Sequence, residues 1–152
     1  EWPEAEDLAN IAERAAGVAR HLGLEPRVAF VSFSTFGYPV SERAEKMHLA
    51  PEVLDKRGVS FEYEGEMAVD VALNTHSMQA YPFSRLTGPA NILVVPARHS
   101  ASISVKLMQE MAGATVIGPI LAGVDESIQI CSSVLTATDI LNMAVLAACK
   151  VG

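Results

Sequence analysis

The sequence is poor in the residues that mark disulfide, metal and redox sites. Among its 152 residues there are two cysteines, Cys131 and Cys149, which form no CxxC pair and are too few for a disulfide framework. The four histidines are scattered, and none lies at the spacing of metal ligands. We therefore expect no metal site, and this cysteine usage favours a reducing cytoplasm.

Basic charge is also scarce. Eleven Lys and Arg stand against 18 Asp and Glu, which gives a formal net charge of −7, and no basic run occurs. This balance argues against nucleic acid or an anionic membrane surface as a partner. The longest apolar runs are broken by Gly and Pro and are too short to cross a membrane, so we expect no membrane span. No GxGxxG nucleotide fingerprint occurs either.

The N-terminus is acidic, lacks the pattern of a signal peptide and does not begin with Met. We interpret the chain as a fragment of a longer protein.

Apolar residues, by contrast, are abundant at 50%, enough for the core of one compact domain. The stretch from Gly88 to Ile120 holds an uncharged run over 91–95, an amphipathic stretch that ends at Gly113, and the start of a second uncharged run over 114–124. This order predicts a strand, a helix and a strand. Continuous apolar runs are typical of strands in a parallel sheet that is covered on both faces.

The remaining pattern alternates between helices and strands. Helices are predicted over 4–22, 41–56 and 136–150 and, with an ambiguous period, over 67–74; Pro51 should interrupt the second of them. Further strands are predicted over 28–34, 59–63 and 127–131. The predicted fold is therefore α/β, with a mostly parallel sheet, helices on both faces, and the strands at 28–34 and 91–95 in its interior.

Two helices carry more detailed expectations. In the first, one apolar face is marked by Leu8, Ile11, Ala15, Val18 and Leu22 and is the predicted core face. In the last, Thr136 is a candidate N-cap, and Asp139 lies in the first turn, where a carboxylate complements the helix dipole.

Two polar groups raise the question of a site. Ser34 and Thr35 follow a predicted strand, and ligands of α/β sheets bind outside the carboxyl ends of the strands. The residues alone, however, favour an ordinary strand-to-helix turn. Glu64 and Glu66 form an acid pair, which could perform acid/base chemistry, but we interpret them as a solvated turn before the next helix.

The segment YPFSRLTGPANILVVPARHSASISVKLMQEMAGATVIGPIL, from Tyr81, resembles the phosphotransacetylase family. More closely, it resembles the phosphotransacetylase-like C-terminal domain of the large bacterial malic enzymes. The likeness extends through FEYEGEMAVDVALN and TDILNMAVLAA and so covers nearly the whole chain. It implies the phosphotransacetylase fold, which is similar to isocitrate/isopropylmalate dehydrogenase and has two α/β parts around a cleft. Residues 1–152 would be the second part, and the terminal helix over 136–150 would return to the missing first part.

The resemblance also implies a chemistry that this sequence only partly supports. Active phosphotransacetylases carry Ser-Arg-Gly shortly before the last helix, with an Arg that clamps the anion, and an Asp base at the start of that helix. Ser132 and Asp139 match, but Ser133 and Val134 replace the Arg and the Gly. Serine cannot supply the permanent, bidentate cation that suits phosphate. We therefore expect no catalysis here, with Ser132 and Asp139 as vestiges; for Asp139, a role at the helix dipole remains an equal alternative.

The resemblance thus implies a regulatory domain of an NADP-dependent malic enzyme, which oxidatively decarboxylates malate to pyruvate. This fragment would hold no cofactor, whereas NADP and a divalent metal would bind upstream. It would sense acetyl-CoA as an effector, and it would form a homodimer within a larger oligomer of the parent. The effector site would include Ser34, Thr35, Asp139 and Asn142. Two alternatives remain open: a fragment of an active phosphate acetyl/butyryltransferase, and a structural assembly module without ligand.

Overall fold

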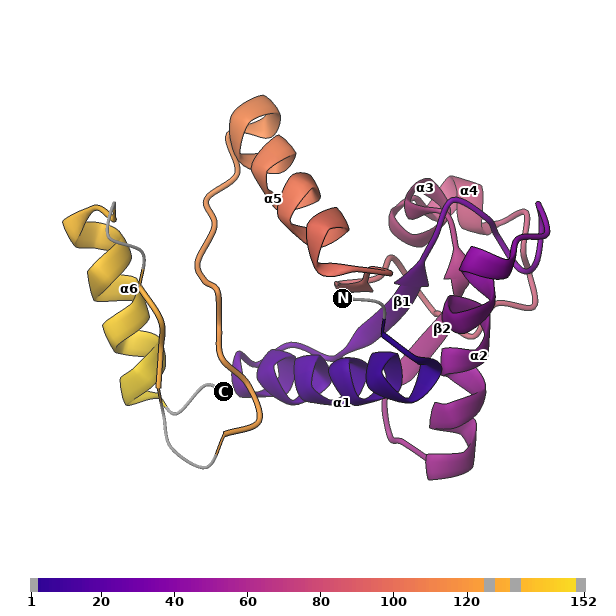
Figure 1. Cartoon of the computed structure of the whole chain (residues 1–152), viewed down its shortest axis with the longest axis horizontal. Coiled ribbons are helices and arrows are strands. Elements are labelled where there is room, and N and C mark those ends of the chain that lie inside the picture. Colours follow the sequence, from indigo (N-terminus) through magenta and orange to yellow (C-terminus); the bar gives the residue numbers. More distant parts are fainter. Residues whose placement is uncertain (1–2, 125–127, 132–134, 150–152) are drawn as a thin grey trace.

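The computed structural model describes residues 3–124, 128–131 and 135–149. Within them lies a three-stranded, fully parallel sheet in the order β2-β1-β3 (Figure 1). Strand β1 (Arg27–Val31) is central, between β2 (Glu62–Met67) and β3 (Ile92–Val94). The predicted α/β class and parallel sheet are confirmed.

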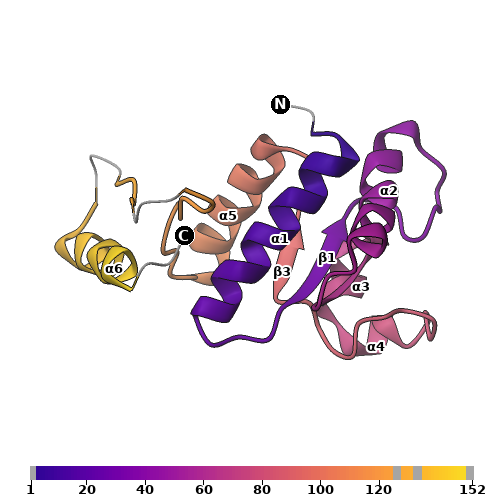
Figure 2. The same ribbon diagram turned by 90° about the horizontal axis from the view of Figure 1, so that it is seen from below.

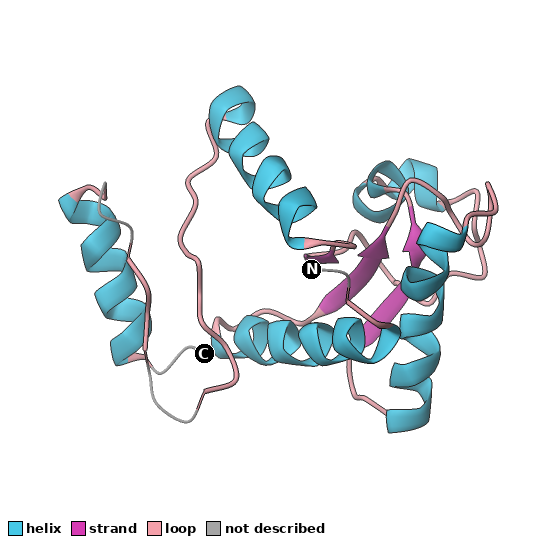
Figure 3. Cartoon of the chain, viewed as in Figure 1, coloured by secondary structure: helices cyan, strands magenta, loops and turns pink. Residues whose placement is uncertain are grey.

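Helices cover both faces of this sheet, as predicted (Figure 3). On one face, α1 (Ala5–His21) and α2 (Glu42–Arg57) pack on Val28 and Phe30. On the other, α3 (Val69–Leu73) and the short α4 (Thr75–Met78) share a core with Ala29 and Val31. Successive side chains of β1 therefore enter different cores, and both cores are apolar, which explains the unbroken hydrophobic run.

Several predicted boundaries are wrong. Helix α2 continues through Pro51, where an interruption was expected. Strand β2 starts later than the predicted 59–63 and runs through the supposed turn at 64–66. Strand β3 lies at an edge of the described sheet and not in its interior, because it pairs with β1 alone.

The last third of the described chain leaves the sheet (Figures 1 and 2). Helix α5 (Arg98–Ala112) ends at Gly113, whose φ of 62° is the left-handed conformation of a helix C-cap, and none of its residues is buried. Segment 114–124 and residues 128–131 form no strand, so the strands predicted there are wrong; Ser127 lies outside the described residues. Helix α6 (Ala137–Ala148) follows. Among the described residues, no helix is both long and apolar enough to span a membrane.

Candidate functional site

The first predicted site residues, Ser34 and Thr35, lie in a tight turn beyond the carboxyl end of β1. The backbones of Thr35 and Tyr38 exchange two hydrogen bonds, of 2.9 and 3.1 Å. Phe36 and Gly37 between them have positive φ values of 49° and 83°, as a two-residue hairpin turn requires. A bulky residue rarely adopts such a φ, and here the Phe36 ring packs against Phe83, with 4.8 Å between centroids. The turn is therefore held in a defined shape.

Glu66, near the end of β2, organises this turn. Its side chain is completely buried, and Oε1 accepts hydrogen bonds from Ser34 Oγ and from the Gly37 backbone N–H, both at 2.8 Å. Its backbone carbonyl accepts from the Phe36 N–H at 2.8 Å. Thr35 Oγ1 accepts from the Ala68 N–H at 2.9 Å. The expectation that Glu66 lies in a solvated turn is wrong, because β2 carries it into the interior.

His48, from α2, completes the group. Its Nδ1 lies 2.9 Å from Glu66 Oε2, while its side chain is 50% exposed. His48 and Glu66 line a hollow of about 460 Å³ between the loop from Gly37 to Ser41 and the first half of α2. This volume is in the range of small-molecule sites. His48 was not predicted as a site residue, since no sequence motif connects it to a carboxylate 18 residues away.

The second pair of predicted residues lies on α6. Thr136 and Asp139 form a capping box: Thr136 Oγ1 accepts from the Asp139 N–H at 3.2 Å, and Asp139 Oδ2 accepts from the Thr136 N–H at 2.9 Å. The hydrogen bond from the Thr136 hydroxyl, followed by that from its backbone, lowers the pKa of Asp139. The predicted N-cap is confirmed, and Asp139 lies in the first turn of α6, as predicted.

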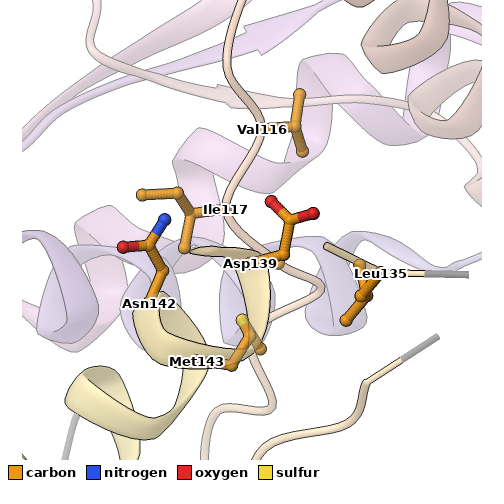
Figure 4. A pocket seen from close by; sticks show the side chains of 7 residues that line it. Val116, Ile117, Leu135, Asp139, Asn142 and Met143 are labelled. Atoms are coloured by element: carbon orange, nitrogen blue, oxygen red, sulfur yellow. The ribbon is translucent and has the colours of Figure 1, made fainter. Parts of the chain in front are cut away.

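Asp139 and Asn142 face segment 116–118 across a cavity of about 10 Å³ (Figure 4). That is about the space of one water molecule. This cavity alone is too small for a nucleotide-sized effector.

The structure does not bring the two predicted pairs together. In both views, α6 lies at the opposite end of the molecule from α2 and the turn after β1 (Figures 1 and 2). Ser132, Ser133 and Val134 lie outside the described residues. Over the ranges that the structure describes, no group of three or more His, Cys, Asp or Glu side chains is placed to hold a metal ion.

The fold and this site define an α/β protein with a doubly covered parallel sheet and a polar turn at its carboxyl edge. Over residues 1–148 the chain matches the family described as phosphate acetyl/butaryl transferase. The chain therefore belongs to that family, and the resemblance drawn from its motifs is confirmed.

Its relatives include two kinds of protein. An NADP-dependent malic enzyme of Rhizobium meliloti is 55% identical over 152 residues, which are the whole of this chain and 20% of that protein. A phosphate acetyltransferase of Bacillus subtilis is 32% identical over 149 residues, which are 97% of this chain and 46% of that protein. The chain thus spans about a fifth of the malic enzyme and about half of the transferase.

Solved structures give the same result. A phosphotransacetylase from Streptococcus pyogenes superimposes with a TM-score of 0.90 at 30% sequence identity, over 98% of this chain and 46% of that one. The EutD phosphotransacetylase from Staphylococcus aureus gives a TM-score of 0.89 at 27% identity, over 99% of this chain and 47% of that one. This domain therefore occurs within NADP-dependent malic enzymes as well as in phosphate acetyltransferases.

Proposed function

We propose that this chain is the C-terminal portion of a regulatory domain in an NADP-dependent malic enzyme, where it senses acetyl-CoA and contributes to oligomerisation. The supporting observation is the identity of 55% over the full chain with a malic enzyme, against 32% with a phosphate acetyltransferase. NADP, a divalent metal and malate would bind in upstream parts of the full-length protein.

The proposed domain regulates and does not transfer acetyl groups. Acetyl transfer to phosphate needs a cation at the anion, and Ser133 and Val134 stand where active members carry Arg-Gly. Asp139, the remaining family residue on α6, hydrogen-bonds to Thr136. The chain therefore keeps the family's fold but has lost the charge that this chemistry uses.

The turn at Ser34 and Thr35 is the better defined part of the proposed effector site. It lies beyond the carboxyl end of the central strand, where α/β domains bind ligands. Glu66 from the neighbouring strand holds its shape through the fully buried Ser34, so a ligand would meet a preformed surface at Thr35. Asp139 and Asn142 would contribute from α6.

The test is malate turnover by the full-length protein with and without acetyl-CoA. We expect acetyl-CoA to change the turnover rate, because an effector with coupling of about 1–3 kcal/mol shifts an equilibrium between two states. A thioester assay with acetyl phosphate and coenzyme A on the same protein should show no acetyl transfer.

Two outcomes would contradict the proposal in different ways. Robust acetyl transfer that Asp139→Asn abolishes would identify an acyltransferase instead. If acetyl-CoA does not change malate turnover, the alternative of a structural assembly module without ligand would be favoured.

A further inference from the structure

His48 is left without a role by the proposed function, although the structure ties it to the most buried carboxylate of the turn. Glu66 is 0% exposed, and its Oε1 is engaged by Ser34 Oγ and the Gly37 N–H, both at 2.8 Å. Its Oε2 is left for the imidazole, at 2.9 Å from Nδ1. A fixed carboxylate of this kind orients a histidine ring and sets which ring nitrogen carries the hydrogen.

The tautomer is determined by the donors and acceptors. As a carboxylate, Glu66 can only accept hydrogen bonds, so Nδ1 of neutral His48 must carry the hydrogen. The other ring nitrogen, Nε2, then bears a lone pair. It points away from Glu66, on a ring that is half exposed and lines the hollow.

The other residues that line the hollow indicate which kind of ligand His48 Nε2 would bind. Glu42 and Glu45 also line the hollow, whereas the nearby Lys46 forms an ion pair with Glu4. Apolar contact is available from Pro39, Val40 and Ala44. Carboxylates at the rim repel phosphate and attract cations.

We propose that this hollow is a second ligand site, in which His48 Nε2 accepts a hydrogen bond from a small molecule that carries a protonated amine. Glu66 is the positioning residue that presents the acceptor, and Glu42 and Glu45 supply the complementary charge. The site goes beyond acetyl-CoA sensing, and its chemistry is opposite to that of a phosphate site.

The first experiment measures the ring nitrogens of His48 by NMR on the whole chain labelled with ¹⁵N-histidine. In the wild type, neutral His48 should show its hydrogen on Nδ1. In Glu66→Gln, the amide oxygen keeps the Gly37 N–H, and the amide nitrogen donates to Nδ1, so the hydrogen should move to Nε2. The control Glu52→Gln, on the exposed surface of α2, should leave the tautomer unchanged.

The second experiment measures binding with ethanolammonium chloride and sodium phosphate as probes, at matched ionic strength. Ethanolammonium should shift the His48 ring and Gly37 amide signals with saturation, whereas phosphate should not. The double variant Glu42→Gln/Glu45→Gln, which changes only exposed side chains, should weaken ethanolammonium binding several-fold.

Each experiment has a result that would contradict the proposal. A wild-type His48 with its hydrogen on Nε2 would remove the acceptor, even if Glu66→Gln failed to fold. Saturation by phosphate, or no response to either probe, would show that the hollow is not an amine site. Because no readout uses malate or acetyl-CoA, these failures are independent of the proposed function.

Discussion

At the scale of single residues, Gly65 shows how closely β1 and β2 approach beside the site. A Cβ on Gly65 would lie 2.7 Å from the carbonyl oxygen and 2.8 Å from the Cβ of Phe30, in the buried central strand, and its φ is 149°. We expect Gly65→Ala to lower the free energy of unfolding by roughly 3 kcal/mol or more, from overpacking and backbone strain together. Urea denaturation measures this change.

Gly17 is the matched control. It lies within α1, and a Cβ at this position would meet no atom within 4 Å apart from its chain neighbours and the backbone of its own helix. Gly17→Ala should therefore raise the free energy of unfolding by roughly 0.5–1 kcal/mol, since alanine is the better helix former. Equal effects of the two substitutions would contradict the close approach at Gly65.

Tyr63 gives a pH prediction. Burial, and then its hydrogen bond to Asp55, raises the pKa of Tyr63 to about 12. The folded state thus holds this proton more tightly than the unfolded state, whose pKa is 10.0. The resulting stability is complete below pH 10 and is lost as the pH rises toward 12.

Ultraviolet titration checks this assignment. Tyr63 should remain protonated well above pH 10, and Asp55→Asn should lower its pKa. If the ionisation signal that Tyr63→Phe removes lies near pH 10, the environment of Tyr63 is not as described.

Single residues also explain why the candidate site was only partly predictable. The turn at Ser34 and Thr35 was predicted because turn residues after an apolar run are a local signal, whereas its assignment to an effector site came from the family resemblance. Glu64 and Glu66 were misplaced, because charges inside a strand contradict the usual pattern of burial. Their partners, Arg85 and Ser34, lie 21 and 32 residues away, so no window of sequence reveals that the two carboxylates are satisfied.

At the scale of elements, α1 shows a similar limit. Its predicted core face included Ile11, which is 48% exposed, while an alanine row packs against the sheet instead. Small side chains let the helix approach the strands closely. A prediction from hydrophobic periodicity, however, gives most weight to the large apolar side chains and so selects the wrong face. The buried residues of α1 are Leu8, Ala9, Ala12, Ala16 and Ala19. The larger face, with Ile11, Ala15 and Val18, instead lines a hollow shared with Ile120 and Ala122.

Helix α5 carries the prediction for assembly. Ile103, Leu107 and Met111 recur four residues apart and are 57%, 52% and 83% exposed. Such a stripe on a helix without buried residues is typical of an interaction surface. We expect the chain to be a homodimer that buries this stripe.

Light scattering coupled to size-exclusion chromatography tests the dimer. The variant Leu107→Glu/Met111→Glu should be monomeric, because two buried charges oppose association. Gln109→Glu adds charge to another side of the same helix and should remain dimeric. A monomeric wild type, or a dimer that tolerates both changes, would contradict this interface.

At the scale of the whole molecule, the sequence was most informative for residues 3–97 and least for the described residues beyond 97. Residues 3–97 form the apolar cores on both faces of the sheet from their own side chains. In most of this region, the hydrophobic pattern of a segment therefore predicts which of its residues are buried. The apolar pattern of segment 114–124 predicts a buried strand, but this segment pairs with none of the described strands. Its apolar pattern alone therefore did not predict its structure; the chain itself spans 20% of a related malic enzyme.

This arrangement leads to the last prediction, on whether the two halves of the proposed effector site act on one ligand. The turn after β1, which holds Thr35, and helix α6, which holds Asn142, lie at opposite ends of the molecule (Figure 1). In the full-length protein, Thr35→Ala and Asn142→Ala should each weaken acetyl-CoA binding, measured by calorimetry. If both positions contact the same ligand molecule, the double variant should bind acetyl-CoA more weakly than either single variant. Glu52→Gln should bind as the wild type does. If one single variant binds normally, its half of the chain lies outside the effector site, and the other half alone holds the ligand.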